Sequence, residues 1–145
     1  MSQENVEVVR GILTGFQGLD LVAFFRDTDH GQMQAILEAV YDPDVEIVWL
    51  DTGPDPGPYR GYQGVLQAFK GWLDSFEEFY FEPTEFIDAG ADVVVPNAQH
   101  GKGKGSGAQV EITTAWVINV RGGKIARVRE YSTKEKALEV AGLSE

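Results

Sequence analysis

The chain has 145 residues, a formal net charge of −11 at pH 7 and no cysteine. This length suits a single domain, residues 1–145, whose core needs no disulfide or metal. The lack of cysteine excludes thiol nucleophiles and thiolate metal ligands, and the excess of acid repels phosphate backbones and anionic membranes. We therefore expect no nucleic-acid or membrane partner, and a neutral or cationic small molecule instead.

The N-terminal residues 1–5 are polar and acidic, without the basic and apolar regions of a signal peptide. Nothing downstream approaches the roughly 20 consecutive apolar residues of a membrane-spanning helix. The absence of cysteine also fits a reducing compartment. These features predict a cytoplasmic protein.

The first part of the chain shows the apolar spacing of amphipathic helices. The positions that carry this spacing are Val6, Val9, Leu13, Phe16, Leu21, Phe24 and Phe25, then Met33, Ile36, Leu37 and Val40 after a polar cap at residues 27–29. Gly15 and Gly18 weaken the junction within the first stretch. Two helices, or three, therefore come first.

The remaining elements alternate between one more helix and a series of strands. We expect a strand over residues 45–51, a helix over residues 65–76, and strands over residues 80–88, 92–100, 110–120 and 124–131. Gly122-Gly123 fits a two-residue hairpin, and the glycine-rich run 101–107 fits a longer one. Ser132 with Glu135 forms a capping box for a short C-terminal helix.

This order predicts an α+β fold in which a curved, mixed or antiparallel sheet wraps around the N-terminal helices and one central helix as a cone-shaped barrel. Side chains alternate between the two faces of a strand, so Thr114 and Trp116 share the apolar face of residues 110–120 and should face the helices. We expect a hydrophobic cavity there. Its ligand-binding candidates are Trp49, Tyr59, Trp72, Thr114, Trp116 and Tyr131. The opposite face suits solvent or a second subunit, and we favour a homodimer through it.

Several motifs carry a family resemblance in this order: Pro43 to Glu46, Tyr59-Arg60-Gly61, the stretch 86–90 and Gly123-Lys124-Ile125. They resemble the SnoaL-like proteins of the nuclear transport factor 2-like superfamily, and the chain ending from Glu130 to Leu143 looks especially like bacterial, often actinobacterial, members. The resemblance implies a cone of helices wrapped by a curved sheet, often dimeric, with a hydrophobic cavity. That cavity serves isomerases, polyketide cyclases, epoxide hydrolases, dehydratases and non-catalytic binders, so the fold alone does not fix a function.

Asp51 and His100 are the catalytic candidates. The resemblance to ketosteroid isomerase, whose base is an Asp, places that base at the end of the first strand, where this chain has Asp51. The alternative for Asp51 is a solvated turn carboxylate. His100 could transfer a proton at neutral pH, or it could simply be solvated beside the glycine-rich run. The histidines and carboxylates show no ligand spacing, so we expect no metal and no cofactor.

An isomerase mechanism does not transfer directly. The position of its protonated acid falls near Thr114-Ala115, the first helix has no tyrosine, and no acid stands on the inner face of residues 110–120. Arg127 and Arg129 share a face that could point inward, toward a carboxylate, or outward. Two hypotheses remain: an acid–base enzyme for isomerisation, cyclisation or hydration of a small hydrophobic metabolite, or a non-catalytic ligand-binding or oligomerisation module.

Overall fold

The computed structural model describes residues 2–51 and 55–143. Within these residues the helices are α1 (Ser2–Phe16), α2 (Leu21–Asp27), α3 (His30–Val40), α4 (Gly61–Leu73) and α5 (Lys134–Val140). The strands are β1 (Tyr41–Trp49), β2 (Tyr59–Arg60), β3 (Phe76–Pro83), β4 (Ile87–Ala89), β5 (Asp92–Gly103), β6 (Gln109–Arg121) and β7 (Lys124–Tyr131).

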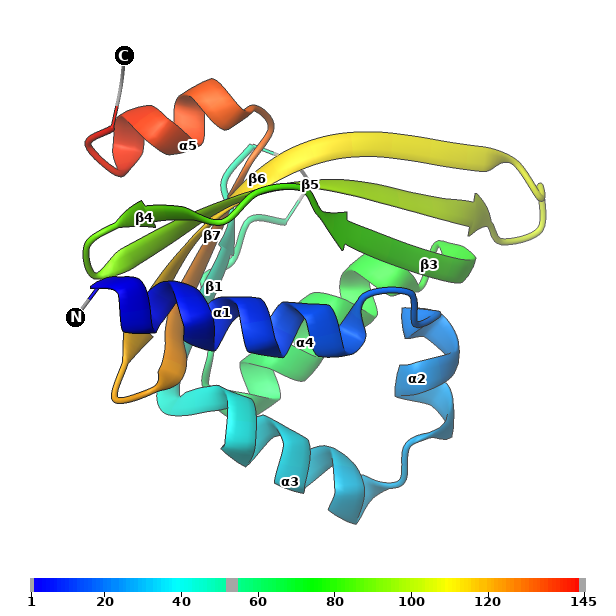
Figure 1. Ribbon diagram of the computed structural model, residues 1–145. Helices are drawn as coiled ribbons and strands as arrows, with labels where there is room; N and C mark the ends of the chain where they lie inside the picture. Colours follow the sequence, from blue (N-terminus) through cyan, green and yellow to red (C-terminus); the bar gives the residue numbers. More distant parts are fainter. Residues whose placement is uncertain (1, 52–54, 144–145) are drawn as a thin grey trace.

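The strands form one mixed sheet in the order β2-β1-β7-β6-β5-β3, with β4 pairing to β5. Only the pairing of β1 with β7 is parallel among the described strands, and the others are antiparallel. The curved sheet has α1 to α4 on one side and α5 on the other (Figure 1). The predicted α+β architecture, with helices inside a curved sheet, is confirmed.

Local sequence signals account for several element ends. Asp20 caps α2 by accepting from the backbone N–H of Val22, and the same oxygen accepts from Phe79 N–H, which ties α2 to β3. Gly122 and Gly123 have φ values of 58° and 79°, as a two-residue hairpin turn requires. The hairpin predicted between β6 and β7 is therefore confirmed.

Three local predictions need correction. The helix predicted over residues 65–76 is α4, which ends at Leu73, and Phe76 instead begins β3. Thr133, rather than Ser132, caps α5 by accepting from Lys136 N–H, since Ser132 is held by Asp51. The single strand predicted over residues 80–88 is two strands. Thr84 leaves the ladder and binds the carbonyl of Pro96 through its N–H and its hydroxyl, and pairing to β5 resumes only at Ile87.

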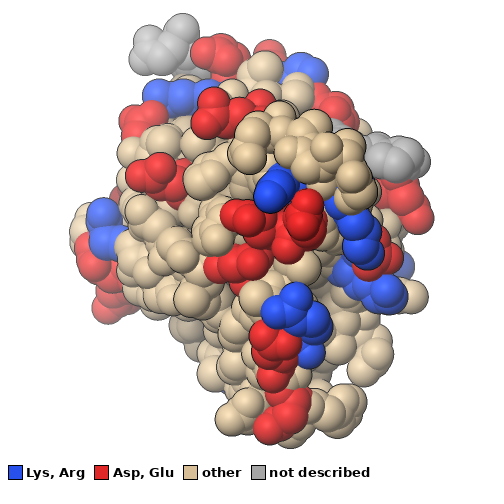
Figure 2. Space-filling model, turned by 90° about the vertical axis from the view of Figure 1, so that its right-hand side faces the viewer, with Lys and Arg blue, Asp and Glu red and all other residues tan. Residues whose placement is uncertain are grey.

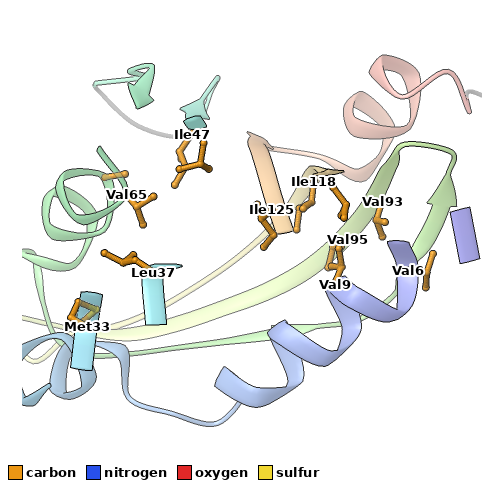
Figure 3. Close-up of a cluster of buried hydrophobic side chains, with 13 residues drawn as sticks. Val6, Val9, Met33, Leu37, Ile47, Val65, Val93, Val95, Ile118 and Ile125 are labelled. Carbon is orange, nitrogen blue, oxygen red and sulfur yellow. The ribbon is translucent and has the colours of Figure 1, made fainter. Parts of the chain in front are cut away.

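The main core lies between the helices and the inner face of the sheet. Figure 3 shows side chains from α1, α3 and α4 pointing toward those of the sheet, including Val9, Leu37, Val65, Val95 and Ile118. Burying such aliphatic side chains is the principal stabilising contribution, about 1.5–3 kcal/mol for each large one. The inner face of the sheet is therefore fixed by this core.

A smaller core lies on the outer face. Ala115, Val117 and Tyr131 pack there against Ala137 of α5. The outer face of β6 was expected to meet solvent or a second subunit, but α5 covers this part of it. The outward alternation of Ala115 and Val117 was right, and their neighbour is a helix of the same chain.

On the face shown in Figure 2, Lys and Arg side chains lie beside acidic ones. Such interspersed charge differs from the continuous basic stripe that nucleic-acid-binding proteins present. Within the described ranges no single helix is long and apolar enough to cross a membrane. Of these described helices, only α1 and α2 taken together have the length and composition of a membrane span, and the two are bent by 82° at their junction.

Candidate functional site

A cavity of about 120 Å³ lies between helices α1 to α4 and the inner face of the sheet. Its lining is mostly apolar. The aromatic lining residues are Phe16, Phe24, Phe25, Tyr41, Trp49, Phe69, Trp72, Phe79, Phe81 and Trp116. All three tryptophans of the chain belong to this set.

The aromatic rings support one another across different elements. Phe25 of α2 stacks on Phe69 of α4 with centroids 5.3 Å apart, and Trp49 of β1 meets Phe69 edge-on at 6.4 Å. Trp116 of β6 meets Phe81 of β3 edge-on at 5.5 Å. Such pairs add to the energy of burial and fix ring orientation, so the wall of the cavity is a set of rings held in place.

Glu130 of β7 is the one carboxylate in this wall among the residues that the structure describes. Glu130 is only 5% exposed to solvent. Val128 lines the same cavity two residues earlier, as alternation along a strand requires. Arg127 is exposed, and Arg129 reaches Asp92 with Nη2 3.5 Å from Oδ2. Neither arginine lines the cavity, so the charge that β7 brings to it is negative.

Three side chains donate hydrogen bonds to the same oxygen of Glu130. Trp116 Nε1, Gln99 Nε2 and Thr114 Oγ1 lie 2.8, 2.9 and 3.1 Å from Glu130 Oε2. The donors come from two neighbouring strands, β5 and β6. Hydrogen bonds to a charged acceptor are shorter and stronger than neutral ones, and burial requires polar groups to be bonded. The sheet therefore holds this carboxylate in one orientation.

The donors of this cluster have fewer hydrogens than the acceptors within their reach. Gln99 Nε2 has two hydrogens and lies 2.9 Å from both Glu130 Oε2 and Asn97 Oδ1 and 3.0 Å from Thr114 Oγ1. Thr114 has one hydroxyl hydrogen, within 3.1 Å of the same two acceptors. Thr114 can therefore donate to only one of them at a time. With Gln99 serving both acceptors, the Thr114 hydroxyl is free to turn between Asn97 and Glu130.

Tyr41, at the start of β1, adds a phenol to the lining. Burial raises the pKa of Tyr41 to about 12. The phenol therefore keeps its proton across the physiological pH range. It is a neutral group that can donate or accept a hydrogen bond.

The predicted ligand-binding residues fall into two groups. Trp49, Trp72 and Trp116 lie in the cavity wall, and Thr114 lies behind it, bonded to Glu130. Tyr59 and Tyr131 do not line the cavity. The Tyr59 hydroxyl donates to the carbonyl of Asp55 at 2.9 Å, and Tyr131 is buried under α5 on the opposite face.

The structure places Asp51 outside the cavity lining, where it joins the end of β1 to α5. Its Oδ1 accepts from Ser132 N–H at 2.8 Å, and its Oδ2 accepts from Ser132 Oγ at 2.8 Å and from Lys136 Nζ at 2.6 Å. The hydrogen bond from Lys136, with smaller contributions from Ser132, lowers the pKa of Asp51. A carboxylate stabilised in this way is a weak base, so this geometry suits a structural tie.

His100 also lies away from the cavity. It is exposed on β5, and its ring stacks on Tyr80 of β3 with centroids 5.6 Å apart. Its neighbour Gln99 takes the inward position because successive side chains of a strand point to opposite faces. The structure therefore brings neither predicted catalytic residue to the cavity. The catalytic roles of Asp51 and His100 remain predictions that the geometry does not support.

Sequence reasoning missed Glu130, Gln99 and Tyr41. The signal for Glu130 was present, because the alternation that turns Arg127 and Arg129 outward also turns Val128 and Glu130 inward. The sequence prediction placed the acid at Asp51 and found none on the inner face of residues 110–120, but it did not extend the same alternation to the following strand. Among the described residues, no group of three His, Cys, Asp or Glu side chains is arranged to hold a metal ion.

Comparison with known proteins defines the class. The profile of the SnoaL-like domain family matches residues 21–128. The chain therefore belongs to the SnoaL-like family. A search of curated proteins finds no match.

Solved structures share the fold over nearly the whole chain. A nuclear transport factor 2-like protein from Burkholderia xenovorans is 27% identical, with 96% of this chain and 95% of that one covered and a TM-score of 0.61. A putative SnoaL-like polyketide cyclase from Jannaschia is 15% identical, with 99% and 94% covered and a TM-score of 0.67. A protein from Catenulispora acidiphila with a ketosteroid isomerase-like fold, solved in complex with trimethylamine, is 19% identical, with 94% and 93% covered and a TM-score of 0.62.

Proposed function

We propose that this protein binds a small hydrophobic molecule in the aromatic cavity and that Glu130 serves as the acid–base group for a proton-transfer reaction on it. The observation that carries the proposal is the buried Glu130 carboxylate, held in the cavity wall by Gln99, Thr114 and Trp116. Isomerisation, cyclisation and hydration all need such a group beside the reacting carbon.

The size of the cavity limits the ligand. An apolar cavity of about 150 Å³ accepts one benzene molecule, and this one measures about 120 Å³. The complex of the Catenulispora relative with trimethylamine supports a ligand of this scale. The part of the ligand enclosed beside Glu130 is therefore about as large as a single small ring or a branched head group.

The arrangement of donors supports a fixed position for the Glu130 carboxylate in the cavity wall. Gln99, Thr114 and Trp116 all donate to Oε2, so that oxygen is oriented before any ligand arrives. Preorganised groups in a water-poor site act more strongly than the same groups in water. The Thr114 hydroxyl can also turn to donate to Asn97 Oδ1, at 3.1 Å, when Glu130 is protonated.

A binding screen followed by turnover tests this proposal. Tryptophan fluorescence reports ligand entry directly, because all three tryptophans line the cavity. Ligands found among small ketones, epoxides and aromatic alcohols are then assayed for turnover with the wild type, Glu130→Gln and Asp51→Asn. We expect Glu130→Gln to lower kcat by about 10²- to 10⁴-fold while ligand still binds, and Asp51→Asn to retain activity. Normal turnover by Glu130→Gln would contradict the proposal.

A further inference from the structure

The charge of the cavity restricts its ligand further. Among the described residues, the lining contains one ionisable carboxylate, Glu130, and no lysine, arginine or histidine. Much of the remaining lining is aromatic, with rings from α2, α4 and β1 represented by Phe25, Phe69 and Trp49. Aromatic faces carry negative electrostatic potential and attract cations. The carboxylate and the aromatic rings of the wall therefore both favour a positively charged ligand.

Three of the groups that donate to Glu130 are neutral: an amide, a hydroxyl and an indole N–H. These three groups orient the carboxylate without adding a positive charge to the cavity wall. A positive charge on a ligand a few ångströms away would interact with the carboxylate in a medium of low dielectric, where solvent screens little. A ligand that also presents methyl or methylene groups would fill the apolar remainder of the cavity.

We propose that the ligand of this cavity is a small hydrophobic cation, an alkylated amine or ammonium group, with the positive centre beside Glu130 and its alkyl groups against Trp49 and Phe69. This inference rests on the proposed function, because it concerns the same cavity. It adds the sign of the ligand charge, which the function proposed above leaves open.

Three molecules of nearly equal size and shape isolate that charge. Choline, 3,3-dimethylbutan-1-ol and 3,3-dimethylbutanoate present a branched head group or chain of similar volume, and they are cationic, neutral and anionic. Each is titrated into the wild type at matched ionic strength, with tryptophan fluorescence as the signal. We expect choline to bind about tenfold more tightly than the alcohol, and the carboxylate to bind more weakly than both.

The variant Glu130→Gln removes the charge while keeping the size of the side chain. We expect its preference for choline over the alcohol to fall several-fold, because only the aromatic contribution remains, while the affinity for the alcohol itself stays nearly unchanged. Glu111→Gln is the matched control, because Glu111 is exposed on β6 and its replacement changes the net charge by the same amount. It should leave the tenfold preference intact. Circular dichroism establishes that each variant is folded.

A second variant keeps the test decisive if Glu130→Gln does not fold. Trp49→Leu retains Glu130 and removes an aromatic face, so it should weaken choline more than the alcohol. Equal or tighter binding of the alcohol by the wild type would overturn the charge inference and leave the cavity proposal standing. A choline preference that is undiminished in Glu130→Gln would also overturn it. Failure of all three molecules to bind would overturn the charge inference, whereas the proposed function is tested separately by the ligand screen and by the turnover of Glu130→Gln.

Discussion

Two carboxylates near the same end of the sheet have opposite surroundings. Asp51 follows β1 and Glu130 lies on β7, and the two segments are joined by the hydrogen bond from Leu50 N–H to the carbonyl of Glu130. Asp51 is exposed and bound by a cation, Lys136. Glu130 is buried and bound by neutral donors. An ion pair at the surface ties elements together, whereas an oriented carboxylate in an apolar cavity can act on a ligand.

The difference follows from which side of the sheet each residue faces. Trp49 and Glu130 are register partners in the parallel β1–β7 pair, and both line the cavity. Two residues past Trp49, the chain has left β1, and Asp51 meets Ser132 and Lys136 near the start of α5. Water screens the charge of Asp51, and protein donors replace water around Glu130. The same functional group therefore has two distinct roles within one corner of the fold.

Removing Gln99 should give the largest effect on this comparison. Gln99→Leu removes the amide group that donates hydrogen bonds to buried Glu130 and to the side-chain oxygen of Asn97. We therefore expect the free energy of unfolding to fall by about 2–3 kcal/mol. Urea unfolding measures it. His100→Leu, on the next residue but on the exposed face, should change stability by no more than about 0.5 kcal/mol. Equal effects of the two changes would show that the buried cluster has no special contribution.

Trp116→Phe should have the next largest effect. It keeps a ring against Phe81 but removes the indole N–H that lies 2.8 Å from Glu130 Oε2. We expect a loss of about 1.5–2 kcal/mol in unfolding free energy. In a double-mutant cycle with Glu130→Gln, the coupling should be about 1 kcal/mol or more. Strict additivity of the two changes would contradict a working hydrogen bond.

Asp51→Asn should have a smaller effect that depends on pH. The pKa of Asp51 is lowered in the folded protein, chiefly by Lys136, so its contribution is present above the unfolded-chain pKa of about 3.9 and is lost as pH falls through the folded value. We expect Asp51→Asn to lower stability by no more than about 1 kcal/mol at pH 7, and by less at pH 3. A difference that grows on acidification would contradict this linkage.

The coupling between Asp51 and Lys136 should be the smallest effect. Their atoms lie 2.6 Å apart, but both side chains are substantially exposed. A double-mutant cycle with Asp51→Asn and Lys136→Met should give about 0.2–1 kcal/mol. It should shrink in 1 M salt, where screening acts within about 3 Å. A coupling larger than that of Trp116 with Glu130 would reverse the contrast between the two sites.

Much of the fold could be predicted from local pattern. The apolar spacing predicted the helices, the alternation of residues 110–120 predicted which face meets them, and Gly122-Gly123 predicted the last hairpin. Local pattern failed where pairing is non-local: whether residues 84–86 remain in the sheet depends on contacts with Pro96, and the cap of α5 moves to Thr133 because Ser132 is bound by Asp51. The distant partner decides in both cases.

The sequence by itself determined the fold class and the apolar inner face of the sheet, because these depend on periodicity and turn chemistry within short stretches, and its motifs carried the resemblance to the family. Only the tertiary structure decided which acid lies in the cavity. Asp51 and Glu130 are similar in sequence terms, because each lies at or near the end of a strand-like stretch. Their environments differ because the parallel pairing of β1 with β7 places Glu130 in the cavity wall, whereas Asp51, beyond the end of β1, is bound by Ser132 and Lys136. Both contacts join segments about 80 residues apart, so short stretches of sequence do not specify them.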